Sequence, residues 1–264
     1  MAADREDTAA LAAALGDGTD VLLDCVAYGQ EHARQLTGLA DRIGSAVVIS
    51  SCAVYEDDQG RGFDTQEEPD GFPHYPVPIP ETYRTVAPGE LSYGTKKVAL
   101  EQELLAAGDR LPATLLRAGA VHGPYSPMLR ELYFIKRALD KRPVRVLAYN
   151  GESRFSPAHT SNIAELVRLA AHRPGSRVLN AVDPRTPTVA EIGAAVDAVL
   201  GVLVRDGARG RSPARGECRG FAVVRTAADG VRHVRGGARA GLPGGDDLRG
   251  LAAGDHRLDP GRLA

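Results

Sequence analysis

The spacing of apolar and polar positions predicts alternating helices and strands in the first fifty residues. Residues 7–15 and 30–43 each carry a helical pattern that ends at a glycine. Residues 20–27 and 46–51 are continuous apolar runs of strand length, which is typical of strands covered on both faces. Short loops join these segments, so the order helix–strand–helix–strand favours a parallel α/β sheet.

Residues 56–90 have a different character, because acidic residues, glycine and six prolines follow one another without a sustained period. We expect a long surface excursion there, and such segments in compact domains are often functional. The pattern then resumes, and it predicts helices at 92–107, 128–140, 161–172 and 188–200, strands at 113–117, near 144–148 and near 177–181, and a Gly/Pro-rich loop at 119–127.

The pattern fades again near the end of the sequence. Residues 202–264 are rich in arginine and glycine and contain one aromatic residue, Phe221. Such a composition is compatible with RNA binding, but a GC-rich gene read out of frame produces it as well, and we favour the second interpretation. Because apolar periodicity is weak, we predict that residues 205–264 form no stable packed element.

Composition narrows the range of functions. The chain has 264 residues, of which 43% are hydrophobic and 25% charged, with a net charge of −2, so no global signal for binding polyanions is present. Apolar runs stay below the roughly 18 residues of a membrane span, and the acidic start lacks the features of a signal peptide. Cys25, Cys52 and Cys218 are too scattered for a disulfide framework or a zinc site. We therefore expect a cytoplasmic protein without membrane segments or a bound metal.

The strongest chemical signal is Tyr93-Gly-Thr-Lys-Lys97 at the start of a predicted helix. Residues four positions apart share one helical face, so Tyr93 and Lys97 are expected to be neighbours. A lysine ammonium beside a phenol lowers the phenol's pKa from about 10, which would suit Tyr93 to general acid–base catalysis. Taken alone, the motif more often marks a surface tyrosine beside a surface lysine.

Two further motifs flank this one. The strand that ends at Ser50-Ser51-Cys52-Ala53-Val54-Tyr55 places two hydroxyl groups at its carboxyl end, where ligands bind in doubly wound sheets. Leu116-Arg117-Ala-Gly-Ala-Val-His-Gly-Pro124 follows the next strand. The order SSxxVY, YxxxK and LRxxxVxGP resembles the extended short-chain dehydrogenases/reductases, of the NAD-dependent epimerase/dehydratase type. The stretches at 20–28, 159–164 and 178–182 also resemble parts of that family, and the resemblance covers about residues 2–200.

The resemblance implies an α/β fold, a Rossmann-like doubly wound parallel sheet with a small C-terminal substrate lobe. Residues 1–125 would then form a partial NAD-binding domain, residues 126–204 the substrate lobe with returning Rossmann elements, and residues 205–264 the Arg/Gly-rich tail. The implied activity is that of an oxidoreductase or epimerase that uses NAD or NADP. It would act on a hydroxyl or keto carbon of a small molecule, with a nucleotide sugar as one candidate, and a homodimer is compatible with it.

The resemblance also assigns roles to single residues. Ser51 would hydrogen-bond the reacting oxygen, Tyr93 would move the proton, and Lys97 would hold the nicotinamide ribose. The remaining implied cofactor contacts are Asp4, Val26, Ala27, Ser50, Ala118 and Gly119. Ser51 and Arg154 are the implied substrate contacts, and His159 is expected to cap a helix rather than to bind a metal.

Departures from the family pattern matter as much as the matches. The glycine fingerprint GxxGxxG, which cradles the pyrophosphate, is not found before residue 20, so the family's first three strands are expected to be missing and NAD binding to be impaired. A truncated, non-catalytic binding module is therefore the alternative function. Cys52 and Ala53 stand where dehydratases of the family carry an acidic pair, so we do not expect a 4,6-dehydratase. The family's diphosphate-binding arginine falls on Phe155, one residue from Arg154.

Overall fold

The computed structural model describes residues 4–154 and 156–208, so Phe155 and the predicted tail beyond residue 208 lie outside the described residues. The described chain divides into two units. The first comprises residues 4–128 and 154–186, and the second comprises residues 129–153 and 187–208. In these ranges no helix is both long enough and apolar enough to cross a membrane.

The first unit is built on a four-stranded parallel sheet, as the apolar runs predict. Its strand order is β1-β2-β3-β7, formed by Thr19–Asp24, Ile43–Ser51, Ala113–Ala118 and Arg177–Ala181. Ser51 pairs with Ala118, and Ala118 pairs with Ala181, so the carboxyl ends of three strands lie level with one another. That edge is where a doubly wound sheet binds its ligands.

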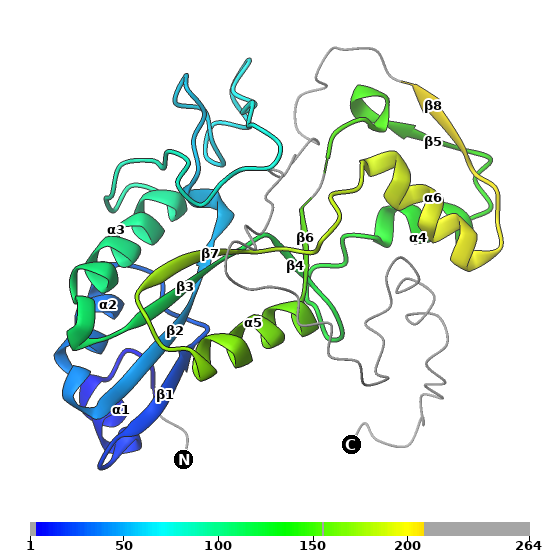
Figure 1. Cartoon of the computed structure of the whole chain (residues 1–264). Helices are drawn as coiled ribbons and strands as arrows, with labels where there is room; N and C mark the ends of the chain where they lie inside the picture. Colours follow the sequence, from blue (N-terminus) through cyan, green and yellow to red (C-terminus); the bar gives the residue numbers. More distant parts are fainter. Residues whose placement is uncertain (1–3, 155, 209–264) are drawn as a thin grey trace, which may run out of the picture. The chain divides into compact units, whose positions relative to one another are not determined.

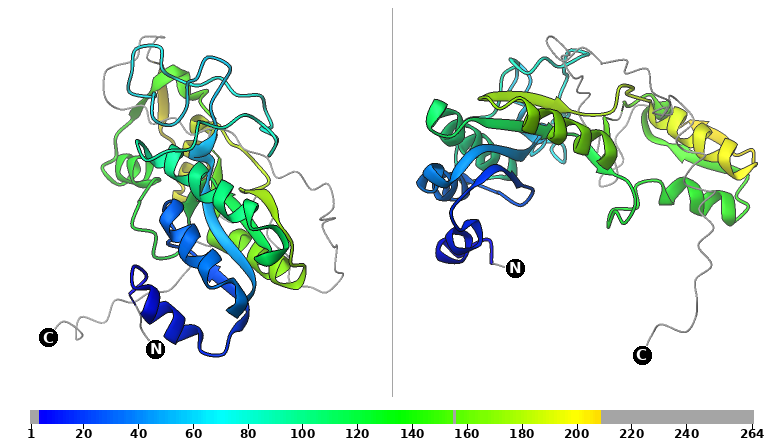
Figure 2. Two further views of the ribbon diagram at one scale, coloured as in Figure 1. Left: turned by 90° about the vertical axis from the view of Figure 1, so that its left-hand side faces the viewer. Right: turned by 60° about the horizontal axis from the view of Figure 1, so that its bottom comes forward.

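Helices cover both faces of this sheet (Figures 1 and 2). Helices α2 (Gln30–Gly38) and α3 (Tyr93–Ala106) pack on one face, and the small helix α1 (Thr8–Leu15) adds to the same cluster. Helix α5 (Thr160–His172) covers the opposite face, where it packs against Val47 and Leu116. The fold is therefore a Rossmann-like α/β sandwich of the kind predicted.

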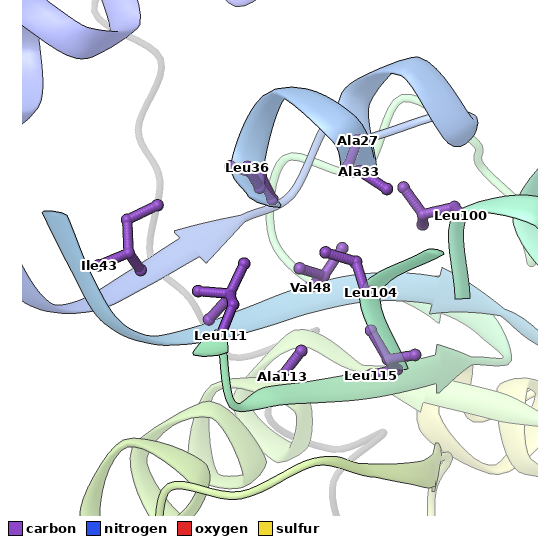
Figure 3. Packing of buried hydrophobic residues seen from close by; sticks show 11 residues of the cluster. Ala27, Ala33, Leu36, Ile43, Val48, Leu100, Leu104, Leu111, Ala113 and Leu115 are labelled. Atoms are coloured by element: carbon purple, nitrogen blue, oxygen red, sulfur yellow. The ribbon is translucent and has the colours of Figure 1, made fainter. Parts of the chain in front are cut away.

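The core beneath α2 and α3 holds these helices in place (Figure 3). Leu36, Leu100 and Leu104 are fully buried against Val48 and Leu115 of the sheet. Burying one such side chain contributes about 1.5–3 kcal/mol relative to leaving it exposed. Because Leu100 and Leu104 follow Tyr93 on the same helix, this packing also fixes the depth at which the start of α3 meets the sheet.

Some boundaries differ from the sequence prediction. Helix α2 ends at Gly38, a short 3₁₀ turn follows (η1, Ala40–Arg42), and β2 already begins at Ile43. The polar residues at 44–45 hide this start of the strand from a pattern analysis, but pairing with β1 and burial of Ile43 extend it. The loop predicted at 119–127 contains a short strand β4 (Ala120–His122), which pairs with β6 (Pro157–His159).

The excursion at 56–90 contains two isolated bridges and no helix or longer strand. In Figure 1 it lies near the carboxyl end of β2. Two further 3₁₀ turns flank the sheet strands, η2 (Cys52–Val54) after β2 and η3 (Gly108–Arg110) before β3. Ile79 and Tyr55 are completely buried in a cluster of their own, so the second half of the excursion is part of the core.

The second unit packs α4 (Leu132–Leu139) and α6 (Val189–Leu200) with the paired strands β5 (Val144–Leu147) and β8 (Arg205–Ala208), and η4 spans Ala148–Gly151. Strand β8 corrects our prediction, because it starts the segment for which we expected no packed element. Arg145, fully buried, forms ion pairs with Asp206 of β8 and with Asp197, which explains the ordering of these four residues.

Candidate functional site

The three residues of the predicted triad come together in the first unit at the carboxyl edge of the sheet. Ser51 is the last residue of β2, while Tyr93 and Lys97 lie on the first two turns of α3. A capping box starts this helix: the Ser92 side chain accepts from the Thr95 backbone N–H, and the Thr95 side chain accepts from the Ser92 backbone N–H. Such a cap fixes the first helical residue, which is Tyr93.

The Ser51 side chain lies close enough to the Tyr93 phenol to act on its pKa. Burial raises the pKa of the Tyr93 phenol above its usual value of 10, the interaction with Ser51 lowers it, and Cys52 and Tyr28 raise it further. Our expectation that Lys97 would lower this pKa is therefore wrong for the chain by itself. The Lys97 ammonium lies 5.7 Å from the centre of the Tyr93 ring, and the largest influence on the phenol's pKa is the loss of water around it.

Lys97 is buried, and its ammonium group joins strand β2 to the loop after β1. Its Nζ donates to the carbonyl oxygen of Ala27 at 2.6 Å and to that of Ile49 at 3.0 Å. An ammonium has three N–H donors, so one remains for a ligand. Burial lowers the pKa of Lys97 to about 8, although Asp24 and Glu101 oppose this shift.

The turn that presents the Ala27 carbonyl is organised by Asp24. This carboxylate is buried and accepts hydrogen bonds from the backbone N–H groups of Val26 and Ala27 at 2.9 and 2.7 Å. Its second oxygen forms a salt bridge of 2.7 Å with Arg5. Asp24 therefore holds the loop after β1 in the position where Lys97 meets it, a role that the apolar pattern of the strand did not reveal.

A second buried carboxylate, that of Glu101, belongs to the surroundings of the site. Glu101 follows Lys97 by one helical turn and forms a salt bridge with Arg117 of β3, with a closest N–O distance of 2.6 Å. The Ser50 hydroxyl donates to the same carboxylate at 2.6 Å. The Arg117 guanidinium also donates to the Glu81 carbonyl and lies 4.8 Å from the Tyr55 ring. This network joins α3, β2, β3 and the excursion, and the spacing Lys97-xxx-Glu101 was its one sequence signal.

The predicted cofactor contacts differ in burial and in what their side chains already bind. The Ser50 side chain is buried and bonded to Glu101, so its hydroxyl is not available to a ligand in this arrangement. Ala27 packs its side chain into the core and offers only its backbone, whereas Val26 is 62% exposed. Ala118 and Gly119 lie at the end of β3, with Ala118 buried and in register with Ser51.

The remaining predicted contacts lie on the surface or at a helix end. Asp4 is exposed and accepts a hydrogen bond from the backbone N–H of Glu6 just before α1, and its cofactor role stays a prediction. Arg154 is exposed and donates to the Thr186 carbonyl at 3.0 Å, so its substrate role also stays a prediction. His159 caps α5 by accepting from the Ser161 N–H, which confirms its assignment as a capping residue.

Comparison with known proteins places the fold. No family model and no curated protein matches the sequence. Solved structures do match, among them UDP-N-acetylglucosamine 4-epimerase from Bacillus cereus, with a TM-score of 0.58 and 16% identity over 79% of this chain and 74% of that one. The chain shares its Rossmann-like α/β fold.

Two other matches have the same fold. The dTDP-glucose 4,6-dehydratase from Bacillus anthracis in complex with NAD matches with a TM-score of 0.55 and 17% identity, over 79% of this chain and 67% of that one. UDP-N-acetylglucosamine 4-epimerase from Methanobrevibacter ruminantium M1 in complex with UDP-N-acetylmuramic acid matches with a TM-score of 0.51 and 20% identity. That match covers 70% of this chain and only 56% of the epimerase, so the chain spans little more than half its length.

Proposed function

We propose that this chain is an NAD-dependent epimerase or oxidoreductase of the epimerase/dehydratase type, acting on a hydroxyl or keto carbon of a nucleotide sugar. The observation that carries the proposal is the meeting of Ser51 and Tyr93 beside the buried ammonium of Lys97. The three groups lie at the ligand-binding edge of a parallel sheet. The relatives in fold, which include nucleotide-sugar epimerases, support the substrate class.

The residues present fit one half of the dinucleotide better than the other. The third N–H of Lys97 is suited to a ribose hydroxyl, and Ala118 and Gly119 would border the nicotinamide. For the pyrophosphate, the sequence before β1 contains no glycine-rich turn ahead of a helix, which is the usual source of backbone donors. The chemistry that NAD supplies when bound is reversible acceptance of a hydride from carbon.

The protein's own part is the movement of a proton. Ser51 would hold the reacting oxygen by a hydrogen bond, and the Tyr93 phenol would donate its proton to that oxygen as the carbon is reduced. In the reverse direction the Tyr93 phenolate would take the hydroxyl proton as the carbon is oxidised. Cys52 and Ala53, next to Ser51, are buried in the η2 turn and supply no carboxyl group for the removal of water. This composition favours an epimerase or oxidoreductase over a 4,6-dehydratase.

The test is turnover of UDP-N-acetylglucosamine, UDP-glucose and dTDP-glucose with millimolar NAD, followed by proton NMR of the anomeric signals. Tyr93→Phe should lower kcat at least about 100-fold, the usual scale for a general acid–base group. The matched control is Tyr125→Phe, because Tyr125 is fully exposed, and it should retain full activity. Turnover that survives Tyr93→Phe would contradict the assignment, and an inactive native chain would favour the alternative of a non-catalytic binding module.

A further inference from the structure

The excursion at 56–90 has an ordered beginning, organised around one carboxylate. Asp57 is buried and accepts hydrogen bonds from the backbone N–H groups of Gln59, Arg61 and His74, each at 2.9 Å. The Arg61 guanidinium adds a salt bridge of 2.8 Å. Burial opposes the ionisation of Asp57, but these donors outweigh it and lower its pKa to about 2. Asp57 therefore ties together Arg61 and His74, which stand on either side of residue 63 in the sequence, through backbone hydrogen bonds and one salt bridge.

The same loop is attached to the first turn of α3. The Ser92 hydroxyl, which caps the helix, donates to Asp64 Oδ2 at 2.5 Å. A side chain at Gly94 would meet the Ala53 carbonyl oxygen at 2.6 Å and the Asp64 carboxylate at 3.4 Å, so the contact is close enough to require glycine. The excursion thus rests on the helix turn that carries Tyr93.

This attachment brings Phe63 to the candidate catalytic tyrosine. The rings of Phe63 and Tyr93 have centroids 6.4 Å apart and planes tilted by 59°. Phe63 nevertheless keeps 39% of its surface exposed. Tyr28, from the loop after β1, is a second aromatic neighbour, with its ring centroid 5.5 Å from that of Tyr93, so Tyr93 meets aromatic rings from two separate segments of the described chain.

We infer that Phe63 is a specificity-determining residue, whose exposed aromatic face contacts the sugar ring whose hydroxyl reaches Tyr93. This inference rests on the proposed function. A pyranose presents C–H groups on its faces and hydroxyls around its rim. The negative face of an aromatic ring attracts the C–H groups, while Ser51 and Tyr93 are placed for the hydroxyl. Tyr28 follows the implied cofactor contacts Val26 and Ala27, whereas Phe63 comes from a segment with no predicted cofactor role.

Phe63 is also held in place before any ligand arrives. An exposed phenylalanine on a loose loop would lose conformational freedom when it packs on a ligand, and that loss weakens binding. Here Asp57 and Asp64 already hold the loop on both sides of residue 63. The ring is therefore preorganised beside Tyr93, and little ordering remains to be done when a sugar arrives.

The test compares binding of UDP-glucose and of UDP alone to the full chain by calorimetric titration. Phe63→Leu keeps apolar volume but removes the aromatic face, so UDP-glucose should bind about three- to tenfold more weakly while UDP is unaffected. Phe63→Tyr keeps the ring and should retain the native affinity. Tyr125→Leu, which removes a fully exposed aromatic ring, is the matched control and should change neither affinity.

Each other outcome overturns part of the reasoning. An unchanged affinity for UDP-glucose in Phe63→Leu, or an equal loss for UDP and UDP-glucose, shows that Phe63 does not contact the sugar. Failure of the native chain to bind UDP-glucose and UDP-N-acetylglucosamine overturns the proposed function and this assignment with it. Circular dichroism of each variant checks that the fold is retained.

Discussion

Replacing Glu101 by glutamine should destabilise the protein far more than the loss of one surface charge. The Glu101 and Arg117 side chains are only 4% and 7% exposed, and they share three N–O contacts of 2.6–3.2 Å. Glutamine has nearly the same shape, so no cavity forms. The Arg117 guanidinium, however, stays buried and charged after its counter-ion is gone.

The size of the effect follows from this desolvation. Removing one partner of a buried ion pair costs about 3–5 kcal/mol, because water cannot reach the charge that remains. Domains have free energies of unfolding of about 5–15 kcal/mol, so the loss is a large part of the total. With about 2–4 °C of thermal midpoint per kcal/mol at this size, we expect Tm to fall by about 6–20 °C. Arg117 keeps its bond to the Glu81 carbonyl, which favours the lower half of that range.

Urea and thermal unfolding, followed by circular dichroism, measure the change. The matched control is Glu165→Gln, because Glu165 and Arg168 form a pair with contacts of 2.8 Å but are about half exposed. Water screens that pair, so the control should leave the midpoint almost unchanged. Adding Arg117→Met to Glu101→Gln should recover part of the loss, since the unpaired charge is then removed. If Glu101→Gln shifts the midpoint no more than Glu165→Gln does, the pair is not desolvated and the reasoning fails.

Two further predictions concern the candidate site. Lys97, with a pKa lowered to about 8 against 10.5 in the unfolded chain, should titrate near pH 8 in carbon-13 NMR of labelled lysine, a spectrum with only four lysines to assign. Because the folded state binds this proton less tightly than the unfolded state does, the contribution of Lys97 to stability should rise between pH 8 and 10.5, and titration at 10.5 would contradict its burial. The 264 residues by themselves should bind NAD with a dissociation constant on the order of millimolar, because they contain no glycine-rich turn between a strand and a helix ahead of β1, and micromolar calorimetric affinity would show that other groups hold the pyrophosphate.

How much of the fold was predictable depends on the length and regularity of each pattern. Helix α3 and strand β3 match their predicted ranges within a residue, because a cap, an apolar stripe and a glycine mark them. Strands β4, β6 and β8 have three or four residues each, too few for a period, and depend on pairing partners distant in the chain.

The candidate site was likewise predictable only in part. The meeting of Ser51, Tyr93 and Lys97 was predictable, because strand ends of a parallel sheet share one edge and residues four apart share one helix face. The direction of the Tyr93 pKa shift was not, because it depends on how much water the surrounding chain excludes. The position of Phe63 beside Tyr93 was not predictable either, because its segment has no period from which that position could be inferred.

The order of the strands has a consequence for synthesis on the ribosome. Strands β1, β2 and β3 are complete once residue 118 has emerged, but β7 ends only at Ala181. Asn180 of β7 accepts a hydrogen bond from Tyr55 and donates one to the Ile79 carbonyl, across 125 and 101 residues of sequence. Contacts of such separation form late in folding. The excursion beside Tyr93 therefore gains its final packing only after most of the chain has been translated, so that a nascent chain stopped before residue 177 lacks a finished site.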